Sequence, residues 1–417
     1  MKEIKRDFYL NKLIERKENG SLKVITGATC CGKSYLLFTL YYNYLRSLGV
    51  AADHIVCIPL DNIDFEAQCD RRELLHYIKD KISGDGTYYI FLDEIQFCKG
   101  FESVLSALLH RINLDIYVTS SNSKFLSSDV ITESRGHGDE IRVHPLSFSE
   151  YMSIQTVSRE DAWNTYCAFG GFPLVCKQDT IESKKQHINH LLEDIHLKEI
   201  IEKNKLQSVS AVAKFVDIVA FNVGSMTNST KIAKAVQSNG FKMSPGSVNT
   251  YLKYLKNAFL LDSSDRYDVG NKKFIFTTKK YYFADSGFRN ARLNFAQSDE
   301  SNIMENIIYN ELKIRGYAID IGTIDLSEKG EDGNKIPKLL PIDFVCNLGS
   351  RRYYIQSALT ILTPEKQEEE ECPLLNIGDN FKKIIITRDQ TTPHYTNDGI
   401  YILNVLDFLL KSDSLEQ

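Results

Sequence analysis

Gly27-Ala28-Thr29-Cys30-Cys31-Gly32-Lys33-Ser34 is the stretch that decides the fold of the first part of this 417-residue chain. A short β-rich run, 22–26, comes directly before it, and an apolar run of helical character, 35–48, follows. Two glycines flanking four residues let a loop wrap so that successive backbone N–H groups point inward at phosphate. A chance Gly-rich turn is disfavoured because a strand precedes the loop and a helix follows it. The positive N-terminal end of that helix also favours a phosphate group. The sequence therefore predicts a phosphate-binding loop (P-loop), whose binding residues are Gly27, Ala28, Thr29, Cys30, Cys31, Gly32, Lys33, Ser34 and Tyr35.

The side chains around this loop predict a nucleoside triphosphate and a metal ion. Lys33 is expected to reach the β- and γ-phosphates, and Ser34 is expected to ligate Mg²⁺. A second apolar run, 88–92, ends in Asp93-Glu94, the Walker B arrangement. Asp93 would hold Mg²⁺ directly or through water, and Glu94 would polarise the attacking water. The alternative for this pair is an acidic cap after an ordinary strand. The predicted cofactors are ATP and Mg²⁺, with Lys33 and Glu94 as catalytic residues.

A third apolar run, 115–119, ends in Ser120-Ser121-Asn122-Ser123. Polar side chains at such a strand tip lie at the carboxyl edge of an α/β sheet, where ligands bind. Asn122 is therefore a third catalytic candidate, holding the γ-phosphate or the lytic water; the alternative is a plain polar loop. Alternation of strands and helices predicts a mostly parallel sheet with right-handed crossovers, from the runs 22–26, 35–48, 55–60, 71–82, 88–92, 101–110, 115–119 and 141–143.

Several stretches together resemble the prokaryotic AAA-type P-loop ATPases of the archaeal-ATPase-like group, which carry a C-terminal domain of uncharacterised function. The stretches are 25–34, 88–96 (YYIFLDEIQ), 119–126 (TSSNSKFL), 145–151 (PLSFSEY), 169–173 (FGGFP), 281–287 (YYFADSG) and 305–316 (ENIIYNELKIRG). The resemblance runs along nearly the whole chain in the family's order. It implies an AAA-type ATPase domain at 1–176, a helical and winged-helix domain at 177–290, and a restriction-endonuclease-like α/β domain at 291–417.

Two departures from the family pattern affect the expected roles of arginines. Thr29 and Cys30 stand where the family usually has two arginines in the loop. The backbone amides would still bind phosphate, whereas any arginine role there is lost. Farther on, the family often has Ser/Thr-Gly-Arg, and this chain reads Glu133-Ser134-Arg135-Gly136-His137. Arg135 is the best match for the arginine that contacts the γ-phosphate or a neighbouring subunit, and a surface arginine is the alternative.

The middle of the chain reads as a winged helix-turn-helix. A first helix is expected over 208–222, a second from Ser229, and a third over 248–260 after Ser244-Pro245, where a cap and an N1 proline precede it. Residues 261–283 alternate as strands, with Gly270-Asn271 as the wing turn. Candidate DNA contacts on the third helix and the wing are Lys242, Ser247, Asn249, Lys253, Lys256, Lys272 and Lys273.

Charge is distributed unevenly over these segments. The whole chain carries a net charge of −5, which argues against a protein that coats nucleic acid. Residues 177–290, however, hold 18 Lys and Arg against 11 Asp and Glu, a net +7 between two acidic segments. This basic centre favours DNA as a partner. A winged helix that binds a partner protein, with lysines that only keep it soluble, is the alternative.

The last segment, 301–417, is similar to the restriction-endonuclease-like fold. The active pattern of that fold needs two carboxylates for Mg²⁺ and a lysine. Glu305 and Asp343 supply carboxylates, but Gln356 stands at the next carboxylate position and Ala358 at the lysine position. A neutral amide is a poorer metal ligand, so Glu305, Asp343 and Gln356 are expected to form a degenerate, inactive site.

Further features restrict the compartment and the function. There is no apolar run of the roughly 20 residues that a membrane span needs, and no apolar core after the N-terminus, so a cytoplasmic protein without membrane contact is expected. The nine cysteines contain no Cys-x-x-Cys pair, so neither structural zinc nor disulfides are expected. The leading hypothesis is an ATPase that acts as a nucleotide-controlled switch. The alternative is a DNA-binding regulatory or defence component whose homo-oligomerisation ATP controls; an ATP-activated nuclease is disfavoured by the missing lysine.

Overall fold

The chain folds into two compact units, each described here by itself. The computed structural model describes residues 3–123, 139–204, 206, 209–296, 299–329 and 335–416. The first unit is Met1–Pro145 with Leu255–Leu260, and the second is Leu146–Tyr254 with Leu261–Gln417. Arg135 and the end of the 119–126 motif lie outside the described residues. The division predicted at residues 176 and 290 stays a prediction.

The first unit is built on a five-stranded sheet in the order β2-β3-β4-β1-β5. Every neighbouring pair in this sheet runs parallel, which confirms the predicted α/β architecture. Its strands are β1 (Lys23–Thr26), β2 (Ile55–Pro59), β3 (Tyr88–Asp93), β4 (Leu114–Ser120) and β5 (Asp139–Arg142). The helices are α1 (Asp7–Glu15), α2 (Lys33–Tyr35), η1 (Leu36–Tyr41, a π-helix), α3 (Tyr42–Ser47), α4 (Arg71–Lys81) and α5 (Phe101–Leu109), with short 3₁₀ turns η2 (Ala52–His54), η3 (Ile63–Phe65), η4 (Ala67–Cys69) and η5 (Ile95–Phe97).

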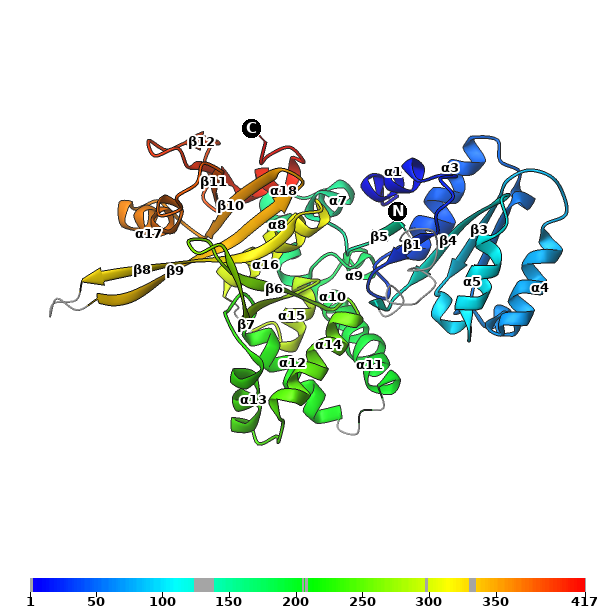
Figure 1. The fold of residues 1–417 in the computed structure, drawn as a ribbon, viewed down its shortest axis with the longest axis horizontal. Coiled ribbons are helices and arrows are strands. Elements are labelled where there is room, and N and C mark those ends of the chain that lie inside the picture. Colours follow the sequence, from blue (N-terminus) through cyan, green and yellow to red (C-terminus); the bar gives the residue numbers. More distant parts are fainter. Residues whose placement is uncertain are drawn as a thin grey trace. The chain divides into compact units, whose positions relative to one another are not determined.

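Helices cover both faces of this sheet. On one face, α4 and α5 bury Leu74, Ile78 and Leu105 in a core shared with the strands (Figure 1). On the other face, the Tyr41 ring of η1 packs against Tyr117, with ring centroids 4.9 Å apart. Helix α4 begins where its pattern predicts, because the Asp70 carboxylate accepts hydrogen bonds from the backbone at its first turn. Because helices pack on both faces of the sheet, the ends of its strands are held in fixed positions.

A buried ion pair lies inside the same sheet. Lys23 on β1 pairs with Asp115 on β4, and both side chains are almost completely buried. Asp115 also accepts hydrogen bonds from the Tyr117 hydroxyl at 2.7 Å and from the Glu18 backbone N–H at 2.9 Å. A buried charge needs such partners, because desolvation alone would make it strongly unfavourable.

The second unit combines a helical part with an eight-stranded mixed sheet in the order β12-β13-β11-β10-β9-β8-β6-β7. Its helices are α7 (Phe148–Ile154), α8 (Arg159–Phe169), α9 (Pro173–Cys176), α10 (Ile181–His190), η7 (Leu191–Leu197, a π-helix), α11 (Lys198–Lys203), α12 (Val209–Phe221), α13 (Ser229–Ser238), α14 (Pro245–Asn257), α15 (Ser286–Arg292), α16 (Glu300–Ile314), α17 (Pro364–Leu375) and α18 (Val405–Leu410). Its strands are β6 (Leu261–Asp268), β7 (Lys273–Phe283), β8 (Ala318–Lys329), β9 (Lys335–Leu348), β10 (Arg351–Ala358), β11 (Lys382–Thr387), β12 (His394–Tyr395) and β13 (Tyr401–Asn404).

Helices α12 and α13 form where the sequence predicts them, and α14 begins and ends three residues before the predicted 248–260. The third helix begins at Pro245, because the Ser244 hydroxyl accepts a hydrogen bond from the Ser247 backbone N–H at 3.1 Å. The following hairpin, β6–β7, was predicted as a wing. It is not a free wing, since β6 pairs in parallel with β8 through residues 266–268 and 321–323. The hairpin therefore forms one edge of the C-terminal sheet (Figure 1).

Two of the motifs quoted above meet in one turn of this unit. The buried Asp285 carboxylate accepts hydrogen bonds from the Gly171 N–H at 2.7 Å and the Gly287 N–H at 2.8 Å. Burial raises the pKa of Asp285 to about 7 although the backbone donors oppose that rise. Gly170 leaves room for the carboxylate, because a Cβ there would lie 1.8 Å from Asp285 Oδ1. The contact ties the end of α8 to the start of α15.

In the described part of the chain, none of the helices combines the length and the apolar character that a bilayer span requires.

Candidate nucleotide site

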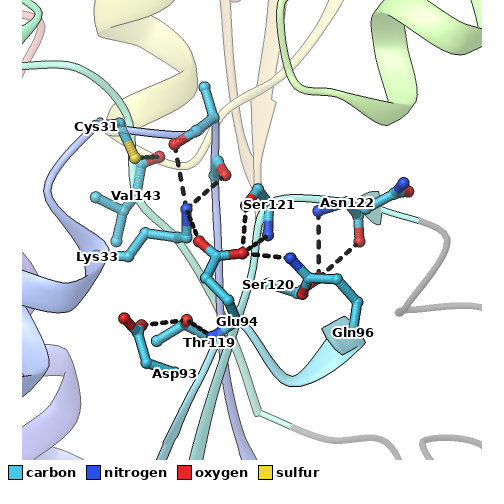
Figure 2. A network of polar contacts seen from close by, with 12 residues as sticks. Cys31, Lys33, Asp93, Glu94, Gln96, Thr119, Ser120, Ser121, Asn122 and Val143 are labelled. Atoms are coloured by element: carbon cyan, nitrogen blue, oxygen red, sulfur yellow. Dashed lines mark hydrogen bonds and ion pairs between the residues drawn. The ribbon is translucent and has the colours of Figure 1, made fainter. Parts of the chain in front are cut away.

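The candidate site lies at the carboxyl edge of the first unit's sheet, where β1, β3 and β4 end side by side (Figure 2). The loop from Gly27 to Gly32 leaves β1 and enters α2 at Lys33. Its two glycines have φ angles of 149° and 104°, which side chains other than glycine rarely adopt. A Cβ on Gly27 would also lie 2.2 Å from the Val143 carbonyl oxygen. Both glycines of the motif are thus required by the backbone itself.

Two side chains, one in the loop and one outside it, hold the loop in shape. The Cys31 thiol is buried and contacts the Val143 carbonyl oxygen at 3.4 Å. Burial raises the pKa of this thiol, so it stays protonated. Arg6, which the sequence analysis did not single out, donates to the Cys31 carbonyl at 3.0 Å and to the His144 carbonyl at 2.7 Å. Arg6 therefore links the loop to the segment after β5.

Lys33 is folded back over its own loop. Its Nζ donates to the carbonyl oxygens of Gly27 at 3.1 Å and Ala28 at 3.2 Å, and it lies 3.1 Å from Glu94 Oε1 (Figure 2). Burial opposes the charged form of this amine, but the nearby acidic groups, Glu94 first among them, together outweigh burial and raise the pKa of Lys33. The ammonium is thus charged and placed at the mouth of the loop, where a phosphate would compete for it.

Glu94 is held by donors on several sides. Its Oε2 accepts hydrogen bonds from the Ser121 hydroxyl, the Ser121 backbone N–H at 3.2 Å and the Gln96 amide (Figure 2). Burial opposes ionisation, but Lys33, Ser121 and Gln96 together outweigh it and lower the pKa of Glu94. The residue also has a φ of 49°, a left-handed backbone that turns its side chain toward the loop. The carboxylate is therefore ionised, and its proton-accepting oxygens are already engaged.

Asp93 and Ser34 lie together as a magnesium site requires. The Ser34 hydroxyl hydrogen-bonds to the Asp93 carboxylate, and the Thr119 hydroxyl donates to Asp93 Oδ1 at 2.5 Å. Thr119 also accepts a hydrogen bond from the Glu94 N–H at 2.8 Å, so it orients both acidic residues. A hydroxyl beside a carboxylate is the oxygen donor set that P-loop proteins offer to Mg²⁺. These residues fit the predicted metal.

Asn122 is the residue at this strand tip that the sequence predicted to hold the γ-phosphate or the lytic water. Its backbone N–H donates to the Ser120 hydroxyl at 3.2 Å, and its side chain points away from Lys33 (Figure 2). Ser121, one position earlier, is the residue of this strand tip that contacts the Glu94 carboxylate. The role proposed for Asn122 stays a prediction, and that of Arg135 falls outside the described residues. The motifs 88–96 and 119–126 include Thr119, Ser121 and Gln96. The sequence therefore placed these residues near the site but did not predict their contacts with Asp93 and Glu94.

The predicted DNA contacts lie on α14, just before it, and at the turn between β6 and β7. Asn249 and Lys253 are exposed and lie four residues apart on α14, and Lys256 follows half-buried on the same face. Lys272 and Lys273 are exposed at the turn between β6 and β7. Of the others, Lys242 is exposed before α14, whereas Ser247 is half-buried in its first turn.

The three residues of the predicted degenerate nuclease site come together. Gln356 Oε1 accepts a hydrogen bond from the Asp343 backbone N–H at 3.2 Å. Glu305 and Asp343 are joined by a lysine, Lys280, which lies on β7, the second strand of the hairpin predicted as a wing.

The parallel sheet, the P-loop and the Asp-Glu pair at the tip of β3 define an AAA-type P-loop ATPase fold. Residues 19–152 match the family described as AAA domain, and residues 160–299 match a domain of unknown function. The chain is 31% identical to an uncharacterised protein of Haemophilus influenzae, over 98% of this chain and 99% of that one. It belongs to the family of that protein, as a member of the AAA-type P-loop ATPases.

More distant similarities also extend over most of this chain. An uncharacterised protein of Methanocaldococcus jannaschii, MJ1544, is 25% identical over 332 residues, which cover 76% of this chain and 70% of that protein. Among solved structures, the Walker-type ATPase paby2304 of Pyrococcus abyssi matches 70% of this chain and 96% of its own, with a TM-score of 0.50 and 16% identity. That similarity concerns the fold.

Proposed function

We propose that this protein binds ATP with Mg²⁺ and hydrolyses it as a nucleotide-controlled switch. The observation that carries the proposal is the contact between Lys33 and Glu94. The two groups on which turnover depends neutralise each other at 3.1 Å. A triphosphate that enters the loop competes for the Lys33 ammonium, and this competition frees the carboxylate. Binding and activation of the base are thereby coupled.

The chain's own residues have distinct tasks in this proposal. The backbone amides of the loop and the Lys33 ammonium bind the phosphates. Ser34 and Asp93 would hold Mg²⁺, and the ion would supply neutralisation of the phosphate charge. Glu94, once released from Lys33, accepts the proton of the attacking water, and Ser121 and Gln96 keep its carboxylate oriented.

The nucleotide state is proposed to control binding of DNA or a partner protein through α12–α14. This part of the proposal is supported by the basic balance of residues 177–290 and by the exposed Asn249 and Lys253 on one helix. DNA binding of this kind weakens steeply as salt rises, because each neutralised phosphate releases counterions. The same surface favours a second candidate function, a DNA-binding regulatory protein whose self-assembly is controlled by ATP.

The first test measures binding of a fluorescent ATP analogue with Mg²⁺. Lys33→Ala should abolish binding, whereas Lys79→Ala, which removes an exposed lysine on α4 of the same unit, should leave it unchanged. Glu94→Gln should still bind the analogue and lose turnover by about 10²-fold or more. If Lys33→Ala binds as the unaltered protein does, or if Glu94→Gln turns over normally, the proposed chemistry is wrong.

The second test measures DNA affinity against salt with Glu94→Gln, with and without ATP. The switch predicts that ATP changes the affinity, and that Lys253→Ala lowers both the affinity and its salt slope. A flat salt response would favour a partner protein. Sedimentation of the same samples separates the candidates, because control by self-assembly requires a change in mass with ATP.

A further inference from the structure

A lysine lies between the two carboxylates of the nuclease-like part of the second unit. Lys280 Nζ is 2.8 Å from Glu305 Oε1 and 3.0 Å from Asp343 Oδ1. The three side chains are only 7%, 9% and 13% exposed. They come from β7, α16 and β9, so the contact joins three elements that lie far apart in the sequence.

The surrounding groups fix both carboxylates toward this lysine. The Tyr282 hydroxyl donates to Glu305 Oε1 at 2.7 Å. The Ser357 backbone N–H donates to Asp343 Oδ2 at 3.0 Å. Both carboxylates that bind the Lys280 ammonium are therefore held in place by further hydrogen-bond donors.

A β-bulge directs Asp343 into the cluster. Asp320 pairs with Val345 and Gly322 pairs with Ile342, so two residues of β9 face one residue of β8 at this point. Bulges of this kind re-aim a side chain without ending the strand. Gly322 permits the bulge, because a Cβ there would lie 2.8 Å from the Cβ of Ile342.

The residues present do not fit a divalent metal ion. Gln356 Oε1 is engaged by the Asp343 backbone, and Ala358 is buried in an apolar cluster with Tyr354 and Ile385. Across the stretches that the structure describes, no group of three or more His, Cys, Asp or Glu side chains is arranged to hold a metal. What lies between the two carboxylates is the ammonium of the chain itself.

We propose that Lys280 is an internal cation that occupies the place a divalent metal would take between Glu305 and Asp343. Two carboxylates this close and this buried need a positive charge between them, because desolvation and mutual repulsion both disfavour them. In a metal-dependent nuclease the ion serves that purpose and is exchangeable. Here the cation is covalently part of β7, so the C-terminal sheet needs no metal and cleaves no phosphodiester. This inference is independent of the nucleotide switch.

The test measures Mn²⁺ binding to the full chain carrying Asp93→Asn, so that the nucleotide site does not contribute. In this background Lys280→Ala should gain one Mn²⁺ per chain, at least about tenfold tighter than any site of the parent, because the carboxylates are left without a cation. Adding Asp343→Asn should abolish the gain. Lys280→Arg, which keeps the charge, should gain nothing. Neither should Lys279→Ala, whose lysine pairs instead with Asp265.

Three results would overturn the proposal. The first is Mn²⁺ binding or plasmid nicking by the parent that Asp343→Asn removes, since the lysine would then leave room for a metal. The second is a well-folded Lys280→Ala that binds no Mn²⁺. If Lys280→Ala does not fold in metal-free buffer, Mn²⁺ should restore the fold, and failure of that rescue likewise contradicts the proposal.

Discussion

Gly170→Ala is expected to destabilise the second unit severely. Gly170 lies at φ 72° and ψ −161°, a region that is essentially limited to glycine. Its added Cβ would also lie 1.8 Å from Asp285 Oδ1, far inside van der Waals contact. The carboxylate cannot move away without giving up its hydrogen bonds to the Gly171 and Gly287 backbone.

The expected magnitude follows from these two effects. Forcing alanine into a glycine-only backbone region costs roughly 1–3 kcal/mol. Losing hydrogen bonds to a buried, partly charged carboxyl group costs about 1.5–3 kcal/mol each. We therefore expect a loss of about 4 kcal/mol or more in the free energy of unfolding, a size that only a few mechanisms produce.

The assay uses the single tryptophan of the chain, Trp163. It is buried on α8, in the same compact unit as Gly170, so urea unfolding followed by its fluorescence reports on that unit. Gly240→Ala is the matched control, because Gly240 has a φ of 85° and nothing within 4 Å of an added Cβ. It should cost only about 1–2 kcal/mol. If the two variants lose the same free energy of unfolding, the close approach of Asp285 to Gly170 contributes nothing to stability, which contradicts the prediction.

Three further outcomes are expected. Lys23→Met should lower the stability of the first unit by about 3–5 kcal/mol, because it leaves Asp115 buried without its cation. The loss is measured as a lower thermal midpoint. Adding Asp115→Leu should restore the midpoint, and no recovery would contradict the ion-pair account. Ionised Glu94 has a pKa below its ordinary 4.5, so its contribution to stability is present at neutral pH and lost as the pH falls through the lowered value; Lys33→Met should weaken this acid dependence, and an unchanged pH profile would show that Ser121 and Gln96 suffice. Arg6→Lys should weaken binding of the ATP analogue, because lysine cannot bridge the Cys31 and His144 carbonyls; equal affinity would show that the loop needs no such anchor.

The fold of the first unit was predictable because its signals are local. A strand, a glycine loop and a helix follow one another within residues 22–48, and the two later apolar runs end in polar residues. Parallel pairing then brings all three strand tips to one edge without further information. The sequence could not show whether Ser121 or Asn122 contacts the Glu94 carboxylate. Both side chains are polar, and the direction of each depends on the backbone conformation after β4.

The second unit was less predictable because its decisive contacts are distant in sequence. Lys280 and Asp343 are 63 positions apart, and the Asp285 carboxylate binds a backbone N–H 114 positions away. The hairpin 261–283 shows its own alternation but not its pairing with β8. The sequence shows that position 358 is not a lysine. It does not show that Lys280, on a different strand, lies between Glu305 and Asp343.

The position of Lys280 has a consequence for how this chain can be divided, in the laboratory or by recombination. A fragment ending near residue 290 would keep Lys280 and Tyr282 and discard Glu305 and Asp343, their partners. It would also remove β8 and leave one side of β6 unpaired. The complementary fragment would retain two buried carboxylates with no cation. The segment that ends near residue 290 and the sheet that follows it therefore have to be kept together in any truncation or chimaera.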